Sequence, residues 1–148
     1  MANRRLRDTS CKSSLAAGFT LLELLVVLAI LALVATLAVP RVISALGKAK
    51  TDVARIQIES LATTLDLYRL DMGDYPTQEQ GLRALLDQPA NVEGWGGPYI
   101  TKADGLTDPW GSAYRYRYPG EHGVYDLYSL GSDNTEGGEG EARDVLNW

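Results

Sequence analysis

The clearest pattern in the chain is an unbroken apolar run from position 19 to position 39. It contains a single charged residue, Glu23, near its start. A helix needs about 20 apolar residues, at a rise of about 1.5 Å each, to cross the hydrocarbon core of a bilayer. The run is therefore long enough to span a membrane, and we expect a transmembrane or assembly helix over residues 19–40.

After Pro40, apolar residues recur every three or four positions, which is typical of an amphipathic helix. Proline kinks a helix rather than ending it when this periodicity resumes, so we expect one helix over about 19–70. Two sets of apolar residues lie on neighbouring faces of its second half: Val42, Leu46, Ala49, Val53 and Ile56, and then Ala54, Ile58, Leu61, Leu65 and Tyr68. These faces need a cover, which the C-terminal region can supply.

Shorter elements are expected beyond Gly73, which ends the long helix. A short helix is predicted over 78–86, with Thr77 as its N-cap. Alternating residues predict strands over 113–118 and 123–130, joined by a hairpin loop that contains His122. Tyr114, Tyr116 and Tyr118 would share one sheet face against the long helix. The pattern predicts an α+β fold, in which a long N-terminal helix packs on a small antiparallel sheet.

The charge of the chain separates a basic leader from an acidic remainder. The 148 residues carry a net charge of −5 and include one cysteine, Cys11. Residues 1–18 contribute a net +3, so the chain without them would carry −8, which argues against a nucleic-acid partner. We expect a leader over 1–18, the apolar helix over 19–40 and a globular domain over 41–148. The positive leader should stay on the cytoplasmic side of a membrane.

Glu23 is the first candidate functional residue. An acid inside a membrane-spanning helix costs about 2.5–3.5 kcal/mol, so such residues are usually functional. A cut between Gly18 and Phe19 would place a new α-amine one helical turn from the Glu23 carboxylate. Two alternatives stay open on this evidence: a conventional signal peptide, whose cut site would follow the apolar run, and an uncleaved single-pass anchor.

The glycine-rich, acidic segment over 131–144 is the second candidate. Carboxylates and inward-turned carbonyls together suit Ca²⁺, which takes six to eight oxygen ligands. The segment carries Asp133, Glu136, Glu139, Glu141 and Asp144. By composition alone, a solvated acidic loop explains it better than a metal site. With one histidine and no cysteine after the leader, the usual catalytic triads are absent, and we expect no enzyme.

Several motifs resemble one known family. They are AGFTLLE at 17–23, DMGDYPTQEQGL at 71–82, GPY at 97–99, DPWG at 108–111, SLGSD at 129–133 and DVLNW at 144–148. Together they resemble the major pseudopilins, or G subunits, of bacterial type II secretion systems, within the type IV pilin-like superfamily. Ser132 and Asn134 are small departures from the family pattern. The alternative is another pilin-like filament subunit, a type IV pilin or a minor pseudopilin.

The resemblance implies a pilin-like fold and a role as the major structural subunit of the pseudopilus. This homopolymeric periplasmic filament takes part in the export of folded proteins across the outer membrane. Prepilin peptidase would cut between Gly18 and Phe19 and methylate Phe19, and Glu23 would pair with a neighbouring subunit's N-terminal amine during assembly. The subunit would cross the inner membrane once, with a cytoplasmic N-terminus and a periplasmic domain. Its other partners would be minor pseudopilins and the inner-membrane assembly platform.

The resemblance also implies one Ca²⁺ in the C-terminal loop. Its ligands would be the side chains of Asp133 and Asp144 and the backbone oxygens of Leu130 and Thr135. Composition alone favours a solvated acidic loop, whereas the resemblance favours a calcium site.

Overall fold

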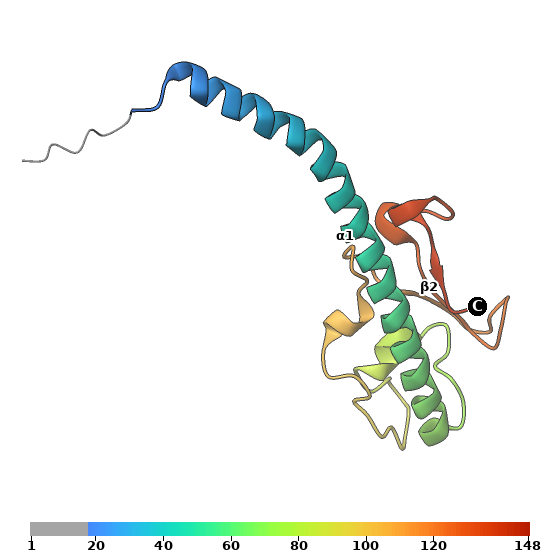
Figure 1. Cartoon of the computed structure of the whole chain (residues 1–148). Coiled ribbons are helices and arrows are strands. Elements are labelled where there is room, and N and C mark those ends of the chain that lie inside the picture. Colours follow the sequence, from blue (N-terminus) through green and yellow to red (C-terminus); the bar gives the residue numbers. More distant parts are fainter. Residues whose placement is uncertain (1–17) are drawn as a thin grey trace, which may run out of the picture. The chain divides into compact units, whose positions relative to one another are not determined.

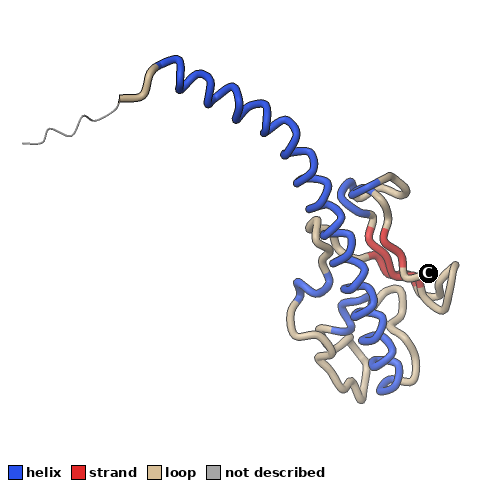
Figure 2. Tube along the Cα trace, viewed as in Figure 1, coloured by secondary structure: helices blue, strands red, loops and turns tan. Residues whose placement is uncertain are grey.

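The computed structural model describes residues 18–148 (Figures 1 and 2). The predicted leader lies outside the described residues, apart from Gly18. One helix, α1 (Leu21–Met72), is followed by short 3₁₀ helices and strands. The chain divides into an N-terminal unit, which ends at Val39, and a C-terminal unit over Pro40–Trp148. The two units are described separately below.

The N-terminal unit contains the first part of α1. All of its described residues are exposed, including the large apolar side chains. By length and composition, α1 is able to cross a membrane, and its apolar window has no buried residue. This part of the helix therefore has no core of its own.

The C-terminal unit buries one face of the rest of α1. The buried residues are Gly47, Ala54, Ile58, Leu61, Leu65 and Tyr68. All of them except Gly47 form the second of the two predicted apolar sets, and these five pack with Leu85 and Leu127 in the core. The first predicted set differs, because Val42, Leu46, Val53 and Ile56 stay exposed. The C-terminal region thus covers one face of the helix and leaves its neighbour open.

A three-stranded antiparallel sheet completes the C-terminal unit. Its order is β1 (Arg115–Arg117), β2 (Asp126–Ser129) and β3 (Val145–Leu146). Tyr116 pairs with Leu127 across the hairpin, and Ser129 pairs with Val145. The two predicted strands are present but shorter than expected. The sequence prediction missed β3, because two residues are too few to show a period.

The predicted helix over 78–86 is wrong in type and length. The structure has a turn followed by the 3₁₀ helix η1 (Gly81–Leu85). Gly81 has a φ of 55°, which an α-helix does not contain, so the turn cannot continue as one. Thr77 does cap this turn: the Gln80 N–H donates to Thr77 Oγ1 at 3.3 Å, and the Thr77 N–H donates to Gln80 Oε1 at 2.9 Å.

The hydroxyls of the three tyrosines of the first predicted strand form hydrogen bonds to different elements. The Tyr114 hydroxyl donates to Gln57 Oε1 on α1 at 2.6 Å. The hydroxyls of Tyr116 and Tyr118 instead donate to the Pro76 carbonyl at 2.8 Å and to Asp74 Oδ1 at 2.6 Å. All three pack with the core that contains the buried face of α1, but of the three only Tyr114 hydrogen-bonds to the long helix. The other two bind the turn that follows α1.

Candidate functional site

The acidic segment over 131–144 connects β2 to β3. It contains two 3₁₀ turns, η3 (Gly131–Asp133) and η4 (Gly140–Ala142). Because its two ends belong to neighbouring antiparallel strands, the entrance and the exit of the loop lie side by side. A Cβ at Gly131 would lie within 2.9 Å of the Arg143 carbonyl oxygen, so only glycine allows this approach at the neck of the loop.

The predicted ligands occupy both ends of this loop. Asp133 Oδ1 accepts the Thr135 N–H at 3.2 Å, and Asp144 Oδ2 accepts the Gly137 N–H at 2.9 Å. The second oxygen of Asp144 is buried without a hydrogen-bond partner. A buried carboxylate oxygen without a donor is unfavourable, and a cation would satisfy it. This oxygen is the feature that fits a metal ion best.

The positions of the acidic side chains limit which ligands a metal ion in this loop could have. Within residues 18–148, no group of three or more His, Cys, Asp or Glu side chains is placed to hold a metal. A cation bound here would therefore need backbone oxygens as well as Asp133 and Asp144. That mixture of carboxylate and carbonyl oxygen is the kind of ligand set that Ca²⁺ takes.

A buried hydrogen-bond chain holds the neck of the loop. Asp108 is only 5% exposed and Ser129 is fully buried. The Ser129 hydroxyl donates to Asp108 Oδ2 at 2.6 Å, and the Gly131 N–H donates to Ser129 Oγ at 3.2 Å. Asp108 Oδ1 also accepts the N–H groups of Trp110 and Ser112. This chain fixes the backbone on both sides of Leu130, whose carbonyl is a predicted ligand.

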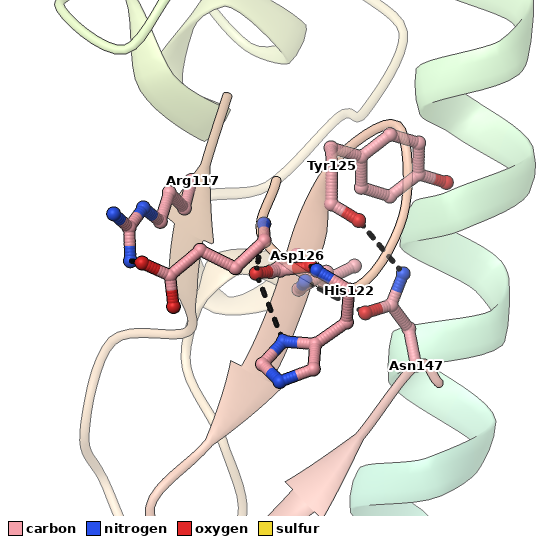
Figure 3. Close-up of polar contacts among 7 residues, drawn as sticks. Arg117, His122, Tyr125, Asp126 and Asn147 are labelled. Carbon is pink, nitrogen blue, oxygen red and sulfur yellow. Dashed lines mark hydrogen bonds and ion pairs between the residues drawn. The ribbon is translucent and has the colours of Figure 1, made fainter. Parts of the chain in front are cut away.

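Sequence analysis placed His122 in the hairpin loop, and the structure gives it partners there. Its ring is stacked on Trp148, with centroids 4.2 Å apart, and its Nδ1 lies 3.2 Å from Asp126 Oδ2 (Figure 3). Burial alone raises the pKa of Asp126, but the N–H groups of Glu121 and His122 and the His122 ring bring that pKa below its usual value. A cavity of about 260 Å³ next to this group is also lined by Asp144.

Asn147 holds the end of the chain against the sheet. Its side-chain Oδ1 accepts the Leu127 N–H at 2.8 Å, and its own N–H donates to the Leu127 carbonyl at 3.1 Å. Its amide nitrogen donates to the Tyr125 carbonyl at 3.4 Å (Figure 3). Sequence reasoning missed this role and that of Ser129, because both depend on which strands become neighbours.

The predicted assembly residues lie at the start of α1. Phe19 is 82% exposed, and Glu23 is also exposed, in the first turn of the helix. The Glu23 N–H donates to Thr20 Oγ1 at 3.1 Å, so Thr20 caps the helix. The spacing of Thr20 and Glu23 is that of a capping box, a signal that sequence analysis did not use. An acid in the first turn also interacts favourably with the helix dipole.

Comparison with known proteins identifies the family. The family model for protein G of the type II secretion system matches residues 41–148. The chain belongs to this family. A second model, for the prokaryotic N-terminal methylation motif, matches residues 14–39.

Relatives are similar in sequence to this protein G family member over most of its length. The type II secretion system core protein G of Pseudomonas aeruginosa is 43% identical over 136 residues, which cover 89% of this chain and 94% of that protein. The protein of the same name from Vibrio cholerae is 43% identical over 134 residues, 88% of this chain and 90% of that protein. A crystal structure of the major pseudopilin of enterohaemorrhagic Escherichia coli matches with a TM-score of 0.55 and 36% identity, over 68% of this chain and 88% of that one.

Membership of the protein G family confirms the expected class of protein. The chain is a structural subunit of a secretion system and not an enzyme, and its fold is that of a pseudopilin. The methylation motif and the apolar helix make it a membrane-anchored envelope protein. Protein G is favoured over the alternative of a type IV pilin or minor pseudopilin.

Proposed function

We propose that this chain is the major structural subunit of a type II secretion pseudopilus, which polymerises through its N-terminal helix. The observation that carries the proposal is the exposure of every apolar side chain over residues 19–39 in a protein G family member. Burial of apolar surface stabilises association by about 25 cal/mol per Å². Contact with copies of the same helix would supply this burial once the subunit leaves the lipid.

Processing would prepare the subunit for assembly. Prepilin peptidase would cut between Gly18 and Phe19 and methylate the new amine of Phe19. The exposed position of Phe19 and the match to the methylation motif support this step. Co-expression with a prepilin peptidase, followed by intact-mass analysis and N-terminal sequencing, should show loss of 18 residues and a methylated Phe19. An unshortened protein would contradict the proposal.

Glu23 would set the position of each subunit by pairing with the N-terminal amine of a neighbour. Such a charge-assisted contact favours register more than overall stability. Glu23→Ala should therefore insert in the membrane normally but give at least about tenfold fewer filaments in sheared fractions. Thr36→Ala, in the same exposed segment, is the matched control and should assemble as the unchanged protein does. Normal filament yield from Glu23→Ala would remove this role.

The chain would reside in the inner membrane with its N-terminus in the cytoplasm and its C-terminal unit in the periplasm. The basic leader supports this topology, because positive segments stay on the cytoplasmic side. Its specific partners would be other copies, minor pseudopilins, the inner-membrane assembly platform and prepilin peptidase. Protease accessibility in spheroplasts tests the topology: the C-terminal unit should be digested from outside.

The loop over 131–144 would bind one Ca²⁺ through Asp133, Asp144 and the backbone oxygens of Leu130 and Thr135. The buried, unpartnered oxygen of Asp144 supports this proposal. A ligand present at 100 times its Kd stabilises the folded state by about 2.7 kcal/mol, so a chelator should lower the Tm of the C-terminal unit by several degrees. Asp144→Asn should remove most of this difference, whereas Asp87→Asn, in an exposed ion pair outside the loop, should keep it. Equal Tm values with and without chelator would exclude the site.

A further inference from the structure

The loop over 131–144 approaches α1 at Gly47. A Cβ built on Gly47 would overlap the Cγ, Cδ and Oε1 atoms of Glu141. The Glu141 side chain therefore lies directly on the backbone of α1, in space that any other residue at position 47 would fill. In Figure 1 the loop before the C-terminus lies beside this part of α1. Both residues belong to the C-terminal unit.

Gly47 is an unusual residue for this place. Glycine in a helix interior is less favourable than alanine, because it loses more backbone freedom on folding. It is the one glycine between Leu21 and Met72, and it is buried although its neighbours Leu46 and Lys48 are exposed. Glu141 of the loop covers Gly47. The contact that glycine permits offsets its unfavourable helix propensity.

Glu141 also belongs to the neck of the loop. A Cβ at Gly131 would lie 2.8 Å from the Glu141 carbonyl oxygen, so the Glu141 backbone packs on the loop entrance. The turn η4, which contains Glu141, thus lies between the entrance of the loop and α1. A change that orders or loosens the loop must also act on the contact at Gly47.

We propose that Glu141 and Gly47 form a docking contact that couples order in the 131–144 loop to the segment of α1 around position 47. This inference deepens the proposed calcium site, on which its second part rests. Linkage is reciprocal: if calcium orders the loop and the loop stabilises this helix segment, then the helix segment also strengthens calcium binding. Gly47 lies only seven residues after Pro40, so the state of the loop acts on the helix close in sequence to its apolar part.

A double-mutant cycle tests the docking contact in the full processed chain in detergent. Tryptophan fluorescence reports the C-terminal unit, because Trp95, Trp110 and Trp148 all lie there. In the Glu141→Ala background, Gly47→Ala has no side chain to displace, and its better helix propensity should raise Tm by about 3–5 °C. In the unchanged background the same substitution displaces Glu141, so we expect no gain or a loss.

Equal Tm shifts in the two backgrounds would overturn the docking contact. Glu139→Ala is the matched control, because it removes one exposed acid from the same loop, and the atoms nearest to a Cβ at Gly47 belong to Glu141. In the Glu139→Ala background, Gly47→Ala should behave as in the unchanged protein. If Gly47→Ala alone does not fold, hydrogen exchange of residues 44–51 in Glu141→Ala replaces it: faster exchange than in Glu139→Ala supports the contact, and equal exchange overturns it.

Calcium titration tests the coupling. Gly47→Ala should raise the Kd for Ca²⁺ by about fivefold, and calcium should slow amide exchange around position 47 in the unchanged protein. An unchanged Kd overturns the coupling while leaving the calcium site intact. If the unchanged protein binds no calcium, the calcium proposal fails, and the cycle of Tm values still decides the docking contact.

Discussion

The two parts of α1 differ in their apolar pattern and in what covers it. From Phe19 to Val39 every apolar side chain is exposed, whereas beyond Pro40 one face is buried by the chain itself. The first part has no internal partner, so its surface must be covered by lipid or by other subunits. The second part carries a core that the rest of the chain completes. If the subunit assembles as proposed, the stability of the C-terminal unit and the assembly of the filament depend on different residues of one helix.

The largest effect is expected when a leucine is replaced by alanine in each part of α1. Leu65→Ala deletes a fully buried side chain and should lower the free energy of unfolding of the C-terminal unit by about 2–5 kcal/mol. Leu28→Ala, in the exposed part, should change it by less than about 0.5 kcal/mol but lower the filament yield. Urea denaturation followed by tryptophan fluorescence, with filament yield measured alongside, checks both results. A comparable loss of stability in Leu28→Ala would break the distinction.

An intermediate effect is expected at the neck of the loop. Ser129→Ala removes a donor to Asp108 and the acceptor of the Gly131 N–H, and should cost about 1–3 kcal/mol. Ser112→Ala keeps the backbone N–H that binds Asp108 and should be nearly neutral. Thermal unfolding of the C-terminal unit measures both variants, and membrane insertion should be unchanged in each. Equal stability of the two variants would show that the buried chain does not hold the loop.

The smallest effect concerns pH. The Tyr118 hydroxyl and the Tyr75 N–H lower the pKa of Asp74, and hydrogen bonds from Glu121 and His122 outweigh burial to lower that of Asp126. A lowered pKa in the folded state means stability that is present above the usual value of about 3.9 and is lost as pH falls through the folded-state pKa. The C-terminal unit should therefore lose stability below about pH 4.

Asp126→Asn checks this pH dependence, because an amide does not titrate. Its Tm should fall less between pH 5 and pH 3 than that of the unchanged protein, while Asp87→Asn, in an exposed ion pair, should follow the unchanged protein. A parallel fall in all three proteins would assign the acid sensitivity to other groups.

Local pattern was enough to predict the long helix, its apolar first part and the hairpin. A run of apolar residues or a three-to-four-residue period is a property of neighbouring positions, and it needs no knowledge of the rest of the chain. The N-terminal methylation motif over 14–39 is equally local, whereas the cut between Gly18 and Phe19 stays a prediction. The capping of α1 by Thr20 was equally local and could have been predicted from its spacing to Glu23.

Only the tertiary structure decided which apolar face of the second part is covered. The sets that begin at Val42 and at Ala54 have the same period, and the sheet and η1 cover the second. The third strand, the hydrogen bond of Ser129 to Asp108 and the position of Glu141 on Gly47 also join residues far apart in sequence. Such contacts depend on how the chain closes on itself, and no local period records them. The amino-acid sequence by itself therefore determined the long helix, its exposed apolar part and the hairpin, whereas packing between distant segments determined the third strand, the loop and its support.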